Sequence, residues 1–348
     1  MNILIIAYCG LDDGFLFASN ALENIGYKIH FCPYLSYIMD KIENKDELVI
    51  NQIIDNNIDI CLWWTNNVSY ESFLKIINYN SYGKSLKHYF YNWDAFLYNY
   101  EKYNSLVWKD RIEKRKLIYP LMTHVFSCNE KEIDYFKSYW NTNTPNISYI
   151  SSGFDRRISY YEYHESYICD VSIVLTNLYK NNEEFPESAT NITRYEIVDK
   201  LYENRDKINF HIYGFENLKE LYPDCYKGFV KYRNCNKVFS NSKVNLSIHP
   251  IVNELNGPYS KEEYFSERVP QILGSKGLLL TNSYLSTYIH NNEDYIYIDK
   301  YMDWFSKIMD IIENSEKYDI IRENGYKKSL EYYQWNNWAN KLDQVIKN

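Results

Sequence analysis

The chain alternates short, continuously apolar runs with longer stretches in which apolar residues recur at helical spacing. The first unit has an apolar run over residues 3–8, a turn over 9–14, an amphipathic stretch over 15–25 that Gly26 ends, and a second apolar run over 28–32. Continuous apolar runs are typical of strands in a parallel sheet that helices cover on both faces. We therefore predict an α/β fold.

The same pattern continues through the chain in two series. Further strands of the first series are predicted at residues 58–63, 88–91, 124–128 and 147–150. The second series has predicted strands at residues 169–175, 209–213, 244–248, 277–281 and 295–298. A helix is predicted at residues 195–204, and residues 301–348 are predicted to be helical. This repetition favours two Rossmann-like halves, each with a parallel sheet.

Residues 151–166 interrupt the periodicity with a glycine, close-set charges and several tyrosines, which favours a connection between domains. With 348 residues, the chain also exceeds the usual length of one domain. The predicted parts are an N-terminal Rossmann-like domain at 1–155, a C-terminal Rossmann-like domain at 156–325, and a helix at 326–348 that returns to the first domain. Trp335 and Trp338 could pin this helix there, although ordinary core packing explains them equally well.

The formal net charge of −8 disfavours a nucleic-acid partner, because an acidic surface repels the phosphate backbone. The densest basic run, residues 109–116, also contains two acids and is typical of a solvated helix face. No stretch reaches about 18 uninterrupted apolar residues, so we expect no transmembrane segment. The seven cysteines include no Cys-x-x-Cys pair, which favours buried, reduced thiols and a cytoplasmic protein.

The turn after the first strand carries no common phosphate-binding motif. A Gly-x-Gly-x-x-Gly turn, which would favour a dehydrogenase, and a Walker loop are both absent. The sequence there is Gly10-Leu11-Asp12-Asp13-Gly14, at the carboxyl edge of the predicted sheet, where ligands of such folds bind. Gly10 and Asp12 are therefore candidate ligand contacts, and Asp13 is a candidate catalytic base.

The segment 262–282, EEYFSERVPQILGSKGLLLTN, leads from charged residues through a short predicted helix into a buried strand. It resembles the retaining GT-B glycosyltransferases that carry a Glu-x-seven-Glu motif, and among them the group related to the spore-maturation CgeB proteins. The resemblance implies a GT-B fold, in which two Rossmann-like domains face a central cleft and a C-terminal helix returns to the N-terminal domain. It also implies an acceptor-binding first domain and a second domain that binds a nucleotide-sugar.

The resemblance assigns a role to the first glutamate of this segment. Glu263 matches the first glutamate of the motif and is expected to act in catalysis by contacting the transferred sugar. The residues of the same loop are expected to line the donor, and they are Tyr264, Phe265 and Ser266.

The second position of the motif departs from the family pattern. Gln271 stands where the family has the glutamate that holds the ribose hydroxyls, and an amide can form hydrogen bonds there but carries no charge. The ribose role therefore stays open between Gln271 and Glu267. Arg268 matches an arginine that is common in the CgeB-like branch, and it is expected at the diphosphate.

Other stretches resemble the same group. They are residues 149–155 as the hinge, 170–176 as the first donor-domain strand and loop, 210–214 as the nucleotide-side strand, and 222–250 as a run that contains Gly228 and a strand ending in His249. These matches place Thr176, Tyr213 and Gly214 among the expected donor contacts. His249 is a further candidate donor contact, although a lone strand histidine is more often structural.

Two further cations are candidates for the diphosphate. Arg194 and Lys231 could, with Arg268, offset the charge that grows on the leaving group, helped by amide donors at helix N-termini. Each of these cations could equally form a surface ion pair.

On the acceptor side, residues 89–94 read as an apolar strand that runs into Asn-Trp-Asp. The family often has His-Asp at this strand end, and here Trp93 replaces the histidine. Asp94 is the candidate acceptor-side catalytic carboxylate, with Asp12 and Asp13 as competitors. Asp94 as a helix cap is the structural alternative. The spacings typical of metal ligands do not occur, so no metal is expected.

The sequence as a whole predicts a glycosyltransferase that moves a sugar from a UDP- or GDP-linked donor to a glycan, lipid or protein acceptor, with retention and without a metal or other cofactor. The expected partners are the nucleotide-sugar and the glycan or glycoconjugate acceptor, with a second copy of the chain as a candidate partner in a homodimer. Alternatives are a sugar-nucleotide epimerase and a non-catalytic carbohydrate-binding protein of the same fold. A DNA-modifying glucosyltransferase is disfavoured by the acidic charge.

Overall fold

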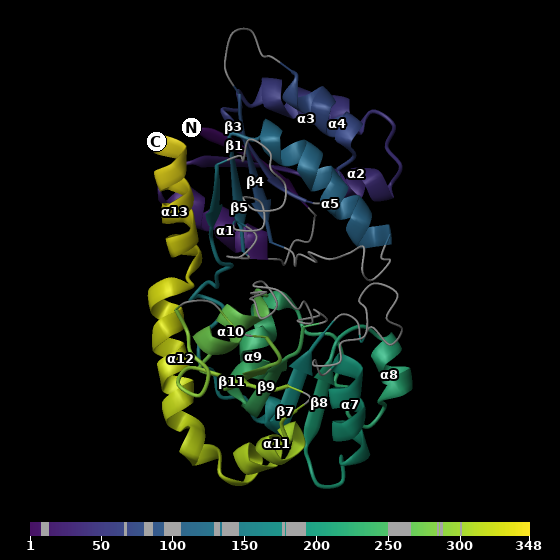
Figure 1. Cartoon of the computed structure of the whole chain (residues 1–348), viewed down its shortest axis with the longest axis vertical. Helices are drawn as coiled ribbons and strands as arrows, with labels where there is room; N and C mark the ends of the chain where they lie inside the picture. The colour runs from purple at the N-terminus through teal and green to yellow at the C-terminus, as the bar shows by residue number, and fades with distance from the viewer. Residues whose placement is uncertain are drawn as a thin grey trace. The chain divides into compact units, whose positions relative to one another are not determined.

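The computed structural model describes residues 1–7, 14–65, 68–79, 86–93, 106–128, 133, 146–175, 178, 193–249, 266–283, 285, 288–299 and 301–348, and all structural statements below concern this part of the chain. These residues form two compact units (Figure 1). One unit consists of Met1–Ser151 and Trp338–Asn348, and the other of Ser152–Asn337.

The first unit is built on a parallel sheet with the strand order β2-β1-β3-β4-β5-β6. Its strands are β1 (Asn2–Ala7), β2 (Lys28–Cys32), β3 (Ile60–Trp64), β4 (Lys87–Asn92), β5 (His124–Ser127) and β6 (Ile147–Tyr149). Its helices are α1 (Gly14–Asn24), α2 (Tyr34–Met39), α3 (Lys45–Asp55), α4 (Tyr70–Ile77) and α5 (Leu106–Ile118), followed by the 3₁₀ turn η1 (Tyr119–Leu121).

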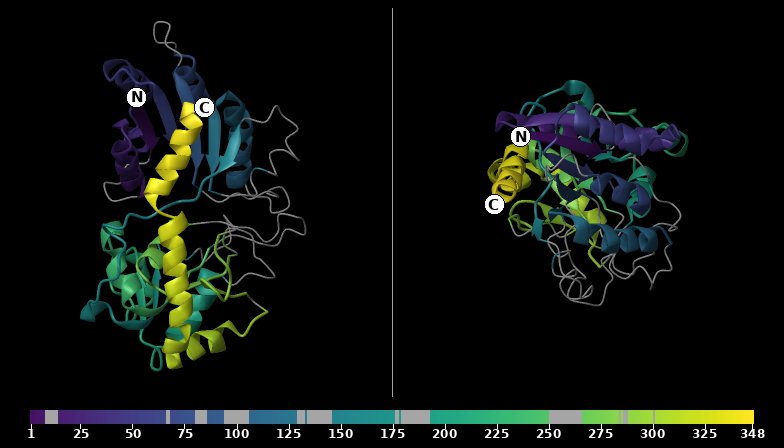
Figure 2. Two further views of the ribbon diagram at one scale, coloured as in Figure 1. Left: turned by 90° about the vertical axis from the view of Figure 1, so that its left-hand side faces the viewer. Right: turned by 90° about the horizontal axis from the view of Figure 1, so that it is seen from above.

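Both faces of this sheet are covered, because consecutive side chains of a strand point to opposite faces. On one face Trp63 packs against Phe73 of α4, with ring centroids 4.7 Å apart. On the other face Trp64 packs against Trp338 at 5.4 Å. Trp338 belongs to the last helix, α13 (Trp335–Lys347), which lies along the sheet in Figure 2. The predicted return of the C-terminal helix to the first domain is thus confirmed.

The second unit is also built on a parallel sheet, with the order β11-β10-β9-β7-β8. Its strands are β7 (Cys169–Val174), β8 (Phe210–Tyr213), β9 (Ser242–Ser247), β10 (Leu279–Thr281) and β11 (Ile296–Tyr297). Its helices are α7 (Arg194–Glu203), α8 (Asn217–Leu221), α9 (Cys235–Ser240), α10 (Arg268–Gly274), α11 (Trp304–Glu313) and α12 (Asp319–Tyr332), with 3₁₀ turns η2 (Glu165–Tyr167), η3 (Tyr232–Asn234) and η4 (Ser315–Tyr318).

Two separate apolar cores hold this second sheet. Helices α7 and α11 contribute to the core on one face, and α9 and α10 contribute to the core on the other (Figure 1). Both sheets have the same order of their first five strands, in which the third strand lies beside the first. The chain therefore leaves these two neighbouring strands in opposite directions, and ligands of such sheets bind at the carboxyl ends of the strands at this switch point. In the second unit that point lies between β7 and β9.

The α/β class and the arrangement in two parallel sheets are confirmed. Each predicted strand, and each of the helices predicted at 15–25 and 195–204, begins and ends within two residues of the observed bounds. No helix in the described part of the chain is long and apolar enough to cross a bilayer. The cysteines that the structure describes are buried and free, and they are Cys32, Cys61, Cys128, Cys169, Cys225 and Cys235.

The predicted C-terminal helix is divided in two by a backbone contact. Phe154 N donates to Tyr333 O at 2.8 Å, and Trp335 N donates to Phe154 O at 3.0 Å. Because residues 333–335 pair with this neighbouring strand-like segment, α12 ends at Tyr332 and α13 begins at Trp335. A Cβ at Gly153 would lie 2.8 Å from Trp335 N, so the two segments approach closely only because residue 153 is glycine.

The compact units divide after Ser151 and after Asn337, whereas the sequence placed the boundaries at 155 and 325.

A buried histidine makes the stability of the first unit depend on pH. His88 is 4% exposed, its Nδ1 accepts a hydrogen bond from Trp63 Nε1 at 3.1 Å, and burial lowers its pKa from 6.5 to about 4. Between pH 4 and pH 6.5, the imidazole of His88 is protonated in the unfolded chain but neutral in the folded chain. The free energy of unfolding is therefore expected to fall as the pH drops from 6.5 towards 4, by up to about 1.4 kcal/mol per pH unit from this residue.

Urea unfolding of the wild type and of His88→Gln at pH 7.5, 6.0 and 5.0 measures this contribution. The variant is expected to lose less stability than the wild type between pH 6.0 and 5.0. Equal losses in the two proteins would contradict the assignment.

Candidate functional site

The carboxyl end of β9 lies beside the start of α7, at the switch point of the second sheet. β9 ends at Ser247, and the carbonyl oxygen of the next residue, Ile248, accepts a hydrogen bond from Arg194 Nε at 2.6 Å. Arg194 is the first residue of α7 and is only 6% exposed. This hydrogen bond places a buried guanidinium group at the carboxyl edge of the sheet.

The local sequence makes α7 begin at this residue. Thr193 Oγ1 accepts from Glu196 N at 3.1 Å, and Glu196 Oε2 accepts from Thr193 N at 2.7 Å, which forms a capping box. The helix therefore begins with its backbone N–H groups and the positive end of its dipole at the same edge as Arg194.

His249 follows Ile248 and is held by a reciprocal pair of hydrogen bonds. His249 N donates to Asn282 Oδ1 at 2.8 Å, and Asn282 Nδ2 donates to His249 O at 3.0 Å. Thr281, the last residue of β10, also donates from its Oγ1 to Ser247 O at 2.7 Å, so the ends of β9 and β10 are connected by side-chain hydrogen bonds. Ser247 Oγ lies 3.3 Å from His249 Nε2. The backbone at this edge is therefore rigidly placed.

The electrostatics of the edge are set by two arginines around a neutral imidazole. His249 is 2% exposed, and burial holds its pKa well below the ordinary value of 6.5. The positive charges of Arg268 and Arg194 lower this pKa further, because both lie close to the ring. The edge therefore carries two fixed positive charges and an uncharged histidine at neutral pH.

Arg268 reaches this edge from α10, of which it is the first residue. Its backbone N–H donates to Ser266 Oγ at 3.2 Å, and Ser266 itself is 7% exposed. Val269, Ile272 and Leu273 of the same helix are fully buried in the core on that face of the sheet. The helix is anchored by its apolar side, so the position of its first residue is fixed.

Gln271 of α10 lies next to a buried tyrosine hydroxyl. The hydroxyl of Tyr232 is shielded from solvent, and burial raises its pKa well above 10, with the negative charge of Glu267 acting in the same direction. The side chains of Gln271 and Trp335 also lie close to this hydroxyl and act in the opposite direction. Gln271 itself is 3% exposed. Its amide therefore belongs to a small cluster of polar side chains around the Tyr232 hydroxyl in the second unit.

The carboxyl end of β8 requires a glycine. A Cβ at Gly214 would collide with the carbonyl oxygen of Leu175 and with the side chain of Leu218. Gly214 N donates to Gly228 O at 3.1 Å, and Tyr226 Oη donates to Gly214 O at 3.0 Å. The chain that follows β8 is thus tied to the loop that leads to the exposed Lys231.

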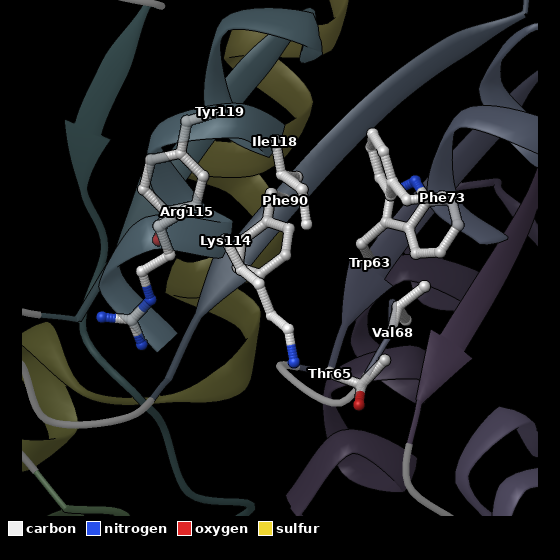
Figure 3. A pocket seen from close by; sticks show the side chains of 9 residues that line it. All are labelled: Trp63, Thr65, Val68, Phe73, Phe90, Lys114, Arg115, Ile118 and Tyr119. Carbon is white, nitrogen blue, oxygen red and sulfur yellow. The ribbon is translucent and has the colours of Figure 1, made fainter. Parts of the chain in front are cut away.

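In the first unit, the described residues at the ends of β3 and β4 line a narrow crevice (Figure 3). It encloses about 10 Å³, which is the space that one water molecule needs. Arg115 of α5 is 3% exposed, and its Nη2 donates to Asn92 Oδ1 at 2.9 Å. Lys114 and Thr65 line the same crevice. The crevice is too small for a sugar, so it is a packing feature of the described residues of the first unit.

The structure brings several of the predicted site residues together and leaves others undescribed. Arg194, His249 and Arg268 lie close together at one edge, Ser266, Glu267 and Gln271 lie at or beside the start of α10, and Tyr213, Gly214 and Lys231 lie at or after β8. The candidates outside the described residues are Gly10, Asp12, Asp13, Asp94, Thr176, Glu263, Tyr264 and Phe265.

Two residues of the edge were not predicted as site residues. Asn282 fixes the backbone of His249, and the polar pair Thr-Asn directly after an apolar strand was a signal that could have indicated it. Tyr232 had no such signal, because its proximity to Gln271 is a tertiary contact.

Comparison with known proteins identifies the kind of protein that carries this edge. Residues 194–344 match the family model of glycosyl transferase-like proteins, a segment that begins at the buried Arg194. The matched segment is less than half of the chain, and the chain as a whole has the GT-B fold. No curated protein sequence matches it. The predicted glycosyltransferase class and GT-B fold are thus confirmed, whereas the Glu-x-seven-Glu assignment stays a prediction.

The similar solved structures of this glycosyltransferase fold have little sequence in common with the chain. Sucrose-phosphate synthase from Thermosynechococcus elongatus has a TM-score of 0.71 at 9% identity, with 100% of this chain and 98% of that chain covered. HepE from Anabaena, in complex with UDP and glucose, has a TM-score of 0.67 at 10% identity, with full coverage of both chains. An α-glucosyltransferase in complex with UDP and DNA has a TM-score of 0.60 at 12% identity, again with full coverage of both.

The pairing of Asn282 with His249 is expected to stabilise the glycosyltransferase fold. Asn282→Ala leaves one buried N–H and one buried C=O without the partner that Asn282 supplies, and each costs about 1–3 kcal/mol, so the free energy of unfolding should fall by about 2–6 kcal/mol. Asn324→Ala, which removes one exposed hydrogen bond to Glu293 O, should change it by less than about 0.5 kcal/mol. Urea unfolding measures both, and similar losses in the two variants would contradict this role.

Proposed function

We propose that this chain transfers a sugar from a nucleoside-diphosphate sugar to a glycan, lipid or protein acceptor, with retention and without a metal ion. The observation that carries the proposal is the pair of arginines at the switch point of the second sheet. Arg194 is buried there against Ile248 O, and Arg268 lies close enough to act on the pKa of the same histidine.

The chemistry of this edge suits a diphosphate. A guanidinium group presents a planar fork of N–H donors that matches phosphate oxygens, and it keeps its charge at all relevant pH values. The start of α7 adds backbone N–H groups and the positive end of the helix dipole. His249 is kept neutral by burial and by the two arginines, so it offers a ring N–H as a donor without adding charge.

The same two cations support the metal-independent reading. When the bond between the sugar and the diphosphate breaks, negative charge grows on the leaving phosphate, and donors fixed in advance stabilise it without reorganisation. Arg194 and Arg268 are fixed in advance, one by its bond to Ile248 O and the other by the buried helix that it begins. Two positive charges at the phosphate can serve the role that a divalent cation has in other transferases.

For the ribose we propose Glu267 in place of Gln271. The amide of Gln271 is buried beside the hydroxyl of Tyr232, where it serves the interior of the unit. Glu267 is half-buried, adjoins Arg268 in sequence and retains the carboxylate that accepts hydrogen bonds from ribose hydroxyls. Tyr213, Gly214 and Lys231 are proposed for the nucleotide side of the donor.

The remaining roles follow the family resemblance. Glu263 is proposed to contact the transferred sugar, with Tyr264, Phe265, Ser266 and Thr176 around the donor, and Gly10 and Asp12 beside it. Asp94 and Asp13 are proposed as carboxylates for the acceptor hydroxyl. UDP is the nucleotide we favour, because two of the similar structures were solved in complex with UDP. DNA, which the α-glucosyltransferase complex contains, is a poor acceptor for a chain of net charge −8.

The diphosphate role of Arg268 is testable by binding alone. Arg268→Ala is expected to weaken UDP binding by about tenfold or more, since a charge-assisted hydrogen bond contributes about 1.5–3 kcal/mol. Arg205→Ala is the matched control, because Arg205 is an exposed arginine of the same unit that pairs with Asp224 at 3.0 Å. Isothermal titration calorimetry measures both. Unchanged UDP affinity in Arg268→Ala, with a folded protein, would contradict the proposed site.

The catalytic role of Glu263 is testable by comparing turnover with binding. Glu263→Gln is expected to lower the release of UDP from UDP-sugars by about a hundredfold or more, because a group that stabilises the transition state is lost, and to leave UDP binding within about twofold. Glu262→Gln in the same segment is the control and should keep its turnover. Release of UDP at the wild-type rate by Glu263→Gln would refute this role.

Product analysis separates the proposal from its alternatives. A UDP-sugar that returns with altered stereochemistry and no free UDP would indicate an epimerase. UDP binding with no turnover on UDP-glucose, UDP-galactose, UDP-N-acetylglucosamine or GDP-mannose would indicate a non-catalytic binding protein.

A further inference from the structure

A tyrosine-rich segment of the second unit is held against the protein by polar contacts. Residues 160–164, with the sequence Tyr-Tyr-Glu-Tyr-His, are called the tyrosine strap below. Glu162 N donates to Ser240 Oγ at 3.1 Å, and Glu162 O accepts from Asn241 Nδ2 at 2.7 Å. His164 N donates to Asn241 Oδ1 at 2.9 Å. The strap therefore has a fixed backbone beside the end of α9 and the start of β9.

The strap buries a charged side chain and exposes aromatic ones, which is the opposite of the arrangement that the hydrophobic effect favours. In an extended chain, alternate side chains point to opposite faces. Glu162 points inwards, where its Oε2 accepts from Asn236 Nδ2 at 2.9 Å. Tyr161 and Tyr163 are 55% and 66% exposed, and Tyr160 is 45% exposed. The strap thus turns a carboxylate towards the protein and aromatic rings towards solvent.

The outward tyrosines contribute little to the fold. The strap is attached through its backbone and through Glu162, and these contacts do not involve the rings. Among the residues that the structure describes, Tyr161 and Tyr163 form no hydrogen bond, ion pair or ring contact. An exposed apolar surface on a rigid segment is typical of a binding surface, and tyrosine offers a flat contact area at a low cost in conformational entropy.

The charge and the size of the surface restrict what it can bind. Residues 158–168 contain two glutamates and no lysine or arginine, which disfavours ligands with phosphate groups such as nucleic acids and anionic lipids. At about half exposure, a tyrosine offers about 100 Å², so the rings of Tyr161 and Tyr163 together offer about 200 Å². A stable protein interface needs about 800 Å² from each partner. The surface therefore fits a narrow, uncharged ligand.

We propose that the tyrosine strap binds an uncharged glycan chain, with Tyr161 and Tyr163 stacked against sugar rings. The C–H groups on the face of a sugar ring pack against the electron-rich face of an aromatic ring, and the sugar hydroxyls remain in water. Residues i and i+2 of an extended chain are about 7 Å apart, which lets neighbouring tyrosines contact neighbouring parts of one chain.

This glycan site is distinct from the proposed donor site. The strap is bonded to Asn241, which directly precedes β9, so it lies at the amino edge of the sheet. Arg194 and His249 lie at the carboxyl edge. The inference rests on the proposed function in one respect: a transferase with a glycan acceptor benefits from a second binding site for that glycan. Binding at the strap requires neither a donor nor turnover.

The test is binding of the labelled full chain to an array of neutral oligosaccharides and polysaccharides. The wild type is expected to bind a subset of them, and Tyr161→Ala/Tyr163→Ala is expected to bind the same glycans about tenfold or more weakly. Tyr161→Phe/Tyr163→Phe keeps the rings and should retain most of the binding. Tyr301→Ala, which removes a 77% exposed tyrosine elsewhere in the same unit, is the matched control and should bind like the wild type.

Two results would overturn the proposal. They are an absence of binding of the wild type to every neutral glycan on the array, and equal binding by the wild type and the double alanine variant. Concentration-dependent self-association in sedimentation that the double alanine variant abolishes would also overturn it, because the strap would then be a protein contact. Arg268→Ala should lose UDP affinity and keep glycan binding. The proposed donor site and the proposed glycan site are therefore tested independently of each other.

Discussion

The parallel strand order is the constraint on which the rest of the second unit depends. Because every strand runs the same way, all carboxyl ends meet at one edge, and each strand must be followed by a segment that crosses a face of the sheet. Between β7 and β9 these segments depart in opposite directions, which brings the start of α7 to the end of β9. The hydrogen bond from Arg194 Nε to Ile248 O is the direct result.

A buried positive charge is costly unless polar groups compensate for it. The carbonyl oxygen of Ile248 accepts a hydrogen bond from the buried guanidinium group of Arg194, and burial keeps His249 uncharged, so that it adds no further positive charge. Asn282 contributes by fixing the backbone of that histidine through two hydrogen bonds. A buried guanidinium group beside a helix N-terminus suits an anionic ligand, which supports the proposal of a diphosphate at this edge.

Gln271 shows why an amide suits a buried position. A buried carboxylate would need a cation or several donors around it. An amide can be buried beside the hydroxyl of Tyr232 without any charge to compensate. Trp335, the first residue of α13, lies near the same hydroxyl, so residues of α10 and α13 meet there within the second unit.

The sequence by itself determined the strands and the two-fold repetition of the α/β pattern. These features follow from local apolar runs and turn residues. The continuous apolar runs of β1 and β3, for example, predict buried strands without any knowledge of tertiary contacts. Tertiary structure alone decided that Arg194 acts on the pKa of His249, that Asn282 holds the backbone of His249, and that Gln271 lies near the hydroxyl of Tyr232. The reason is that these partners are 33 to 55 positions apart in sequence and become neighbours only when separate strands and helices pack.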